Sequence, residues 1–203
     1  MTEVDLDVDD EDEDEAPGWD AIEAAVAQIV PPQDPMHWGT NVLPGQDGIY
    51  GLSAYRVNDY WLLVTFGLTE LFSKTSDDAA VSGWGFELTM RLPATEAQPP
   101  NWALRLLQQL GRYVFTTGQP LGDGHRMDPG GPITGEPNSR LTAVAFVVDP
   151  ELGTIDTPHG AVQFLTVLGI TTDELARMKA TSTAHVVAEL AATTPLLITD
   201  AGR

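Results

Sequence analysis

Apolar and polar residues alternate over positions 82–93, which read SGWGFELTMRLP. One face of this pattern consists of large apolar side chains, namely Trp84, Phe86, Leu88, Met90 and Leu92. The other face is small or polar and consists of Gly85, Glu87, Thr89 and Arg91. A period of two over this length predicts a β-strand with one face in a core and the other face wetter or covered by polar contacts. We expect this strand to form the centre of a sheet.

Other apolar runs predict further strands. Residues 49–57 and 60–67 are separated by Asn58-Asp59, which is typical of a two-residue hairpin turn. Apolar residues occupy both faces of the run 60–67, with Trp61 opposite the Tyr60 stripe, so this strand is expected to be covered on both sides. Three more strands are expected over 141–148, 161–170 and, as a short terminal strand, 195–199.

Apolar residues at helical spacing predict helices over 19–30, 101–116, 171–179 and 183–192. Asp20 is placed to cap the first helix, and two prolines end it. Tyr113 lies on the broad apolar stripe of the second helix, which we expect to lie on the sheet. Thr171 and Glu174 have the spacing of a capping box. A single helical turn is expected over 68–72.

The remaining segments read as loops. A Pro- and Gly-rich loop is expected over 31–48, a polar loop over 73–81 and turns over 153–160. Residues 117–140 hold six glycines and four prolines without a regular period, which indicates a long surface loop of the kind that often carries function. Strands and helices do not alternate regularly. The sequence therefore predicts an α+β fold with a mixed, largely antiparallel sheet and helices packed on it.

The formal net charge is −20, and ten of the 30 acids lie within residues 1–15. Residues 1–17 hold too few apolar groups to offset chain entropy, so we expect a disordered acidic tail followed by one domain over 18–203. Asp5, Asp7 and Asp9 resemble the start of a calcium loop. The loop positions that require Gly and Glu hold Asp and Ala instead, and we expect no metal site there.

Charge also limits the class of partner. Both the tail and the rest of the chain repel phosphate, which excludes nucleic acid and disfavours anionic membranes as partners. A basic protein partner would be attracted. The sequence has no cysteine, no basic segment leading into an apolar one and no run of 18 apolar residues, so we expect a soluble, cytoplasmic protein.

No strong catalytic constellation is found. The four histidines lie in separate segments, and the sequence contains no HExxH, GxSxG or phosphate-binding loop, so neither a cofactor nor a metal is expected. Glu87 is the one carboxylate within a strongly apolar strand. It is either a general acid or, as we favour, hydrogen-bonded or paired with a base such as Arg91. Asp123 and His125 form either an acid–imidazole pair or an ordinary glycine-rich turn.

Five blocks of sequence together resemble the Suppressor of fused family. They read YWLLVTFGLTELF, SGWGFELTMRLP, PPNWALRLLQQLGRYVF, GTIDTPHGAVQFLTVLGITTDEL and PLLITD. Their order and spacing agree with the family over about residues 20–200. The resemblance implies the family's α+β domain and a non-enzymatic protein-binding function.

The resemblance also implies a mode of binding. Animal members carry this domain followed by a second lobe, and they hold a peptide of a Gli-type transcription factor between the two lobes by strand addition. Since the sequence stops at Arg203, we do not expect the two-lobed clamp, and Gli binding is not carried over. Single-domain bacterial members occur in toxin–immunity settings, which favours an immunity protein that neutralises a basic partner toxin.

Three residues correspond to the partner-facing surface of animal members. The tyrosine of the RYVF block is Tyr113, and the following acid and histidine match Asp123 and His125 with an apparent shift of one residue. Tyr113 is either an interface anchor or an ordinary helix-packing residue. Two other functions remain open. One is a signalling adaptor that binds a peptide by strand addition, and the other is a hydrolase that uses Glu87 or the Asp123/His125 pair. A tail that mimics nucleic-acid charge is a further alternative.

Overall fold

The computed structural model describes residues 15–40 and 48–203. The disordered tail predicted over 1–17 and the rejected calcium loop lie outside the described residues as far as residue 14, and Pro17 already begins a helix. Residues 41–47 of the expected loop also lie outside the described residues.

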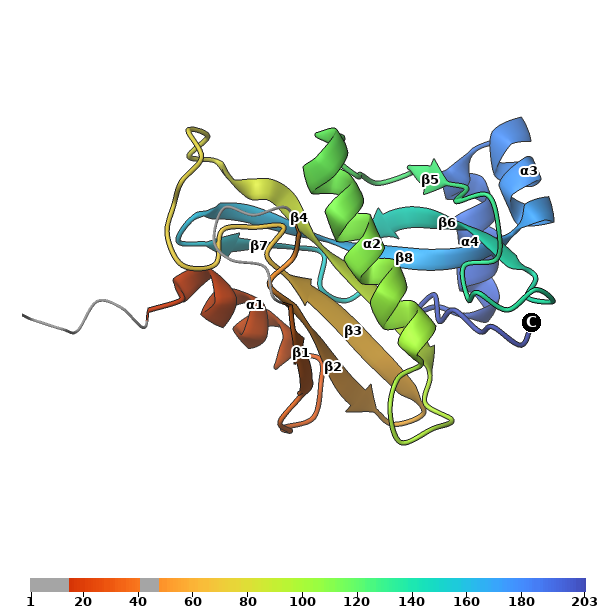
Figure 1. Cartoon of the computed structure of the whole chain (residues 1–203), viewed down its shortest axis with the longest axis horizontal. Coiled ribbons are helices and arrows are strands. Elements are labelled where there is room, and N and C mark those ends of the chain that lie inside the picture. The colour runs from red at the N-terminus through yellow and green to blue at the C-terminus, as the bar shows by residue number, and fades with distance from the viewer. Residues whose placement is uncertain (1–14, 41–47) are drawn as a thin grey trace, which may run out of the picture.

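One eight-stranded sheet organises the described residues, with the strand order β1-β2-β3-β4-β8-β6-β5 and with β7 paired to β8 (Figure 1). The strands are β1 Met36–Gly39, β2 Gly51–Val57, β3 Tyr60–Phe66, β4 Val81–Pro93, β5 Arg126–Met127, β6 Leu141–Val148, β7 Thr154–Thr157 and β8 Gly160–Thr171. All pairs are antiparallel except β4 with β8. The expected mixed, largely antiparallel α+β fold is confirmed, and the 13-residue β4 lies at its centre.

Helices cover both faces of this sheet. They are α1 Pro17–Val26, α2 Asn101–Thr117, α3 Thr172–Ala180 and α4 Thr183–Thr193. Figure 1 shows α2 crossing one face diagonally. Its buried leucines form one core with the β4 side chains Phe86, Leu88, Met90 and Leu92. On the opposite face, α1 packs on β2 and β3, while α3 and α4 pack on β6 and β8. The two faces of β3 lie in different cores, as its apolar pattern predicts.

Three strands lie inside segments that the sequence predicts as loops or turns. β1 lies within 31–48, β5 within 117–140, and β7 within 153–160. Each has four residues or fewer and pairs with a neighbouring strand by main-chain hydrogen bonds. Strands of two to four residues are too short for a period of two to be distinguished from a loop sequence.

Two expected elements are wrong. Residues 68–72 form no helical turn, because the Leu68 carbonyl, which would accept from Phe72 in such a turn, accepts from the N–H of Trp84 instead. Residues 195–199 form no strand, since Leu197 adopts a φ of 54° and its N–H closes a turn on the Thr194 carbonyl. The N–H of Thr199 nevertheless donates to the carbonyl of Arg91, which fixes this segment to the end of β4.

The remaining helix limits agree closely with the pattern, apart from α1. That helix starts at Pro17 and ends at Val26, not at residue 30. Its N-cap is Ala16 and makes no side-chain cap bond, so Asp20 is a first-turn acid and not the cap. The capping box at the start of α3 is confirmed, with Thr171 and Glu174 bonding reciprocally.

Candidate protein-binding site

Tyr113 lies on the outer side of α2, near its C-terminal end. The buried stripe of this helix includes Leu110 and Val114, whereas Tyr113 is 36% exposed. The helix ends at Thr117 and is capped by Gly118, whose φ of 67° suits a residue without a Cβ and turns the chain back toward the sheet. Its length and end point therefore place an aromatic side chain beside the sheet edge.

The segment after α2 returns to that edge and pairs with β6. The N–H of Gly124 donates to the Phe146 carbonyl at 2.8 Å, and the N–H of Phe146 donates to the His125 carbonyl at 2.9 Å. Arg126 and Met127 then continue the pairing as β5. The hydroxyl of Thr183 on α4 donates to the Gly124 carbonyl at 2.8 Å, which anchors the turn from the other side.

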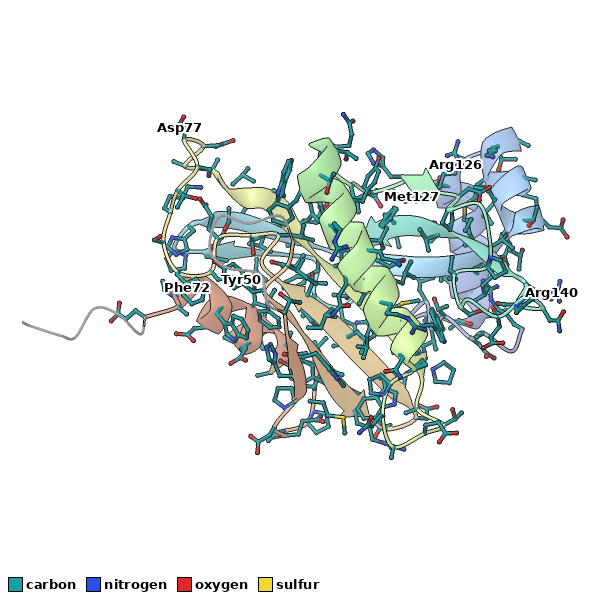
Figure 2. All side chains as sticks on the ribbon, viewed as in Figure 1. Tyr50, Phe72, Asp77, Arg126, Met127 and Arg140 are labelled. Atoms are coloured by element: carbon teal, nitrogen blue, oxygen red, sulfur yellow. The ribbon has the colours of Figure 1, made fainter. Side chains whose placement is uncertain are left out.

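A hollow of about 550 Å³ lies between α2, β5 and α3. Its walls include Tyr113 from α2, His125 and Met127 from the β5 segment, and Leu175 and Lys179 from α3. Figure 2 labels Arg126 and Met127 at this edge of the sheet. The structure thus brings together Tyr113 and His125, which lie far apart in the sequence.

Asp123 occupies a different position. Its Oδ1 accepts a hydrogen bond from the N–H of Val148 at 3.2 Å, and the residue does not line the hollow. Among the described residues it makes no hydrogen bond to His125. The Asp123 side chain therefore binds the last N–H group of β6. Among the described residues, Asp123 and His125 do not form an acid–imidazole pair that could transfer a proton.

Glu87 is fully buried, and its carboxylate binds a loop. Oε1 accepts from the N–H groups of Gly67 and Thr69, both at 2.9 Å, and from the Thr69 hydroxyl at 2.8 Å. Oε2 accepts from the Thr65 hydroxyl at 2.6 Å. Burial raises the pKa of Glu87 to about 7, and these hydrogen bonds oppose the rise. Because four donors surround this fully buried carboxylate, its role in the structure is to hold the chain between β3 and β4.

Of the two alternatives favoured for Glu87, hydrogen bonding is confirmed and pairing with Arg91 is wrong. Arg91 instead forms a bidentate pair with Asp149, with nitrogen–oxygen distances of 2.6 and 3.0 Å, and also contacts Glu151 at 2.8 Å. Positions 87 and 91 lie four residues apart on an extended strand, which is too far for a side-chain pair, while the turn after β6 delivers Asp149 beside Arg91. Arg91 and Asp149 are both buried.

The other strand residues singled out from the sequence pack against α2. Trp61 and Phe86 are buried in the core beneath this helix. Trp84 is half-buried and meets Phe115 of α2 edge to face, with ring centroids 5.9 Å apart. None of the three contributes to the hollow beside Tyr113.

Sequence reasoning missed Arg126, Met127, Leu175 and Lys179, which line the same hollow. No local signal marks them, because the site is assembled from a two-residue strand and a helix about 50 positions later. It also missed a second hollow of about 740 Å³, lined by Tyr50, Phe72, Trp84 and Phe115 among others. Figure 2 labels Tyr50 and Phe72, which lie at the end of the molecule opposite Arg126.

Over residues 15–40 and 48–203, no three His, Asp or Glu side chains gather in a way that could hold a metal ion. Within the same ranges, no helix has the length and apolar character that a bilayer span requires.

Comparison with known proteins identifies the family. The model described as Suppressor of fused protein (SUFU) matches residues 45–203, which is most of the chain. The chain belongs to the Suppressor of fused family. The human Suppressor of fused homolog is 33% identical over 149 residues, covering 66% of this chain and 30% of the human protein, and the mouse protein gives the same figures. This chain therefore spans less than a third of the length of these curated relatives.

Solved structures of the Suppressor of fused family share the fold. A chain in the crystal structure of the Sufu–Fu complex has a TM-score of 0.85 at 30% identity, covering 93% of this chain and 91% of that one. Drosophila Suppressor of Fused has a TM-score of 0.83 at 30% identity, covering 93% of this chain and 51% of that one. A SUFU homologue from Neisseria gonorrhoeae has a TM-score of 0.58 at 13% identity, covering 87% of this chain and 90% of that one, and supports the fold alone.

Proposed function

We propose that this Suppressor of fused chain is a non-enzymatic binding module that grips an extended segment of a partner protein at the β5 edge. The observation that carries the proposal is the open strand beside Tyr113. Backbone groups of successive residues in an antiparallel strand point to opposite sides. Since the His125 carbonyl accepts from β6, the N–H and C=O of Arg126 point away from the sheet. An added strand would pair with them, and Tyr113 would contact its side chains.

The residues of the site support a recognition surface. Tyrosine is a favoured interface anchor because it offers a large contact area at a small cost in rotamer entropy. One solved relative is a complex of Sufu with Fu, which supports a protein as the class of partner. The hydrolase alternative has no support from the geometry, because Glu87 is buried and bound while Asp123 and His125 are not paired.

Strand addition is tested by removing the outward N–H of Arg126. We would select peptides from a displayed random library on the wild-type chain and measure their affinity for Arg126→Ala and Arg126→Pro. Proline lacks the N–H and is tolerated on an edge strand. The account predicts that Arg126→Pro binds at least tenfold more weakly than Arg126→Ala. Equal affinities of the two variants would contradict strand addition.

A second candidate is neutralisation of a basic toxin, as in immunity proteins. It is supported by the excess of 30 acidic over 10 basic side chains, which would speed encounter with a basic protein at low salt. The lack of cysteine supports a cytoplasmic location for such a module. If a neighbouring locus encodes a toxic product, co-expression of this chain should then restore the growth of cells that produce it. Absence of any rescue would leave the regulatory adaptor as the better function.

A further inference from the structure

The side chains of the β5 segment point alternately to the two faces of the sheet. Met127 pairs with Val144 and packs against the core beneath α2. Arg126 pairs with Ala145, which belongs to the core beneath α3 and α4, and its Nη1 donates to Thr183 Oγ1 at 3.1 Å. A strand added outside β5 would follow the same alternation, because cross-strand neighbours share a face. Its successive side chains would therefore meet two different environments.

The environment on the α2 side includes two exposed ring side chains, Tyr113 and His125, beside the exposed Gln119 and Pro120. The environment on the α3 side is cationic. Lys179 lines the hollow there and is exposed, and Arg126 contacts only the neutral Thr183 hydroxyl among its described partners. In the described part of the chain, neither of these two cations pairs with a carboxylate.

This charge contrasts with the rest of the chain. Among the residues that the structure describes, Asp128 is the only acid lining the hollow, and its Oδ1 accepts a hydrogen bond from the Gly130 N–H. Residues 97–122, which include α2, hold two arginines and no acid, in a chain with 30 acids. The hollow beside β5 is thus lined by two cations, Arg126 and Lys179, against one acid, on a chain of net charge −20, so an acidic segment would meet an excess of opposite charge there.

We infer that the segment bound at β5 is acidic, with Asp or Glu side chains at alternate positions facing Arg126 and Lys179 and apolar or aromatic side chains between them facing Tyr113. The inference rests on the proposed function and specifies the chemistry of its partner. The two cations supply charge-assisted contacts along one face, and the tyrosine supplies apolar contact along the other. A basic segment would place like charges together and be rejected.

The test uses the peptides that the displayed library yields on the wild-type chain. Synthetic copies of the three tightest peptides are measured by fluorescence anisotropy against wild type, Lys179→Glu and Arg140→Glu. Arg140 is an exposed arginine outside the hollow, so its reversal changes the net charge equally and serves as the matched control. Circular dichroism and thermal unfolding of each variant serve to check that its fold is intact.

The inference predicts peptides with acids at every second position, a loss of about tenfold or more with Lys179→Glu and less than threefold with Arg140→Glu. Peptides that depend on Tyr113 but are neutral or basic would overturn the inference and leave the proposed site standing. Acidic peptides whose affinity falls equally with Lys179→Glu and with Arg140→Glu would also overturn it, because their binding would then depend only on the net charge of the chain. Failure to obtain any peptide weakened by Tyr113→Ala would overturn the proposed function itself.

Discussion

Two buried charges on β4 show how single residues organise this protein. Glu87 binds the chain after β3 through two N–H groups and two hydroxyls. Arg91 binds the turn after β6 through Asp149. Between them, Thr89 donates to Asp149 at 2.6 Å. The polar face of β4 therefore carries a buried series of hydrogen bonds that connects the strand to the loop after β3 and to the turn after β6.

Glu87 makes stability depend on pH. Its pKa is raised from 4.5 to about 7, so the folded state retains a proton that the unfolded state releases. The stabilisation is fully present below pH 4.5 and is lost as the pH rises through 7. Glu87→Gln removes this titration. Relative to wild type, the variant should gain about 3 kcal/mol of unfolding free energy between pH 4 and pH 8, measured by urea denaturation. A difference between the two proteins that stays constant across this range would contradict the burial argument.

Asp149 should show the opposite dependence. Burial alone would raise its pKa, but the hydrogen bonds and charge of Arg91 outweigh it and lower the pKa to about 2. Its contribution is therefore present above pH 4 and is lost as the pH falls toward 2. At neutral pH, Asp149→Asn should cost about 3 kcal/mol, because it weakens the pairing of a buried arginine. Glu151→Gln, at a side chain 30% exposed, should cost less than about 1 kcal/mol. Equal losses in urea denaturation would refute a dominant buried pair.

Substitution of Tyr113 distinguishes a role in partner binding from a role in helix packing. Because the side chain is 36% exposed, Tyr113→Ala should change the unfolding free energy by less than about 1 kcal/mol while weakening peptide binding at least tenfold. Leu110→Ala, one turn earlier and buried, should instead cost about 2–5 kcal/mol. If Tyr113→Ala destabilises the fold as much as Leu110→Ala does, the tyrosine is a packing residue.

At this scale, the sequence predicts burial better than partners. The alternation over residues 82–93 correctly places Glu87 and Arg91 on one face of a central strand. It does not identify their partners, because Asp149 lies 58 positions further along the chain and meets Arg91 only once the sheet has formed. Hydrogen bonds from Gly67 and Thr69 to Glu87 likewise depend on how a loop folds back.

At the scale of elements, periodicity locates the long strands and helices and misses the short ones. β3, β4, β6, β8 and α2 have clear patterns, and each lies where its pattern indicates. β1, β5 and β7 exist because a neighbouring strand offers backbone partners, which is information outside their own sequences. The candidate site is missed in part for this reason, since its edge strand has two residues.

The capping box of α3 is the element-scale feature that the sequence specifies most directly. Thr171 accepts a hydrogen bond from the Glu174 N–H at 3.2 Å, and Glu174 accepts one from the Thr171 N–H at 2.8 Å. Thr171→Ala should lower the unfolding free energy by about 1 kcal/mol, and Thr171→Ser should restore most of it. Since α3 carries Leu175 and Lys179, the same alanine variant should also bind selected peptides more weakly. Unchanged stability of the alanine variant in urea would show that the cap contributes little.

At the scale of the whole molecule, net charge distinguishes the two partner chemistries. Residues 1–15 contribute half of the formal charge of −20. Deleting residues 1–14 should speed association with acidic peptides at low salt, because it reduces long-range repulsion, and the effect should vanish near 0.5 M salt. A basic toxin would respond in the opposite direction. Stopped-flow association rates of the deletion variant and the full chain at two salt concentrations provide the measurement.

Pairing of a partner segment with the main chain of β5 is the central claim, and amide hydrogen exchange tests it most directly. Exchange would be followed residue by residue in the free chain and in the chain saturated with the tightest selected peptide. The account predicts that the outward N–H of Arg126 exchanges quickly in the free chain and becomes strongly protected in the complex. Protection confined to other residues, such as those around Phe72 and Trp84, with Arg126 unchanged would contradict it.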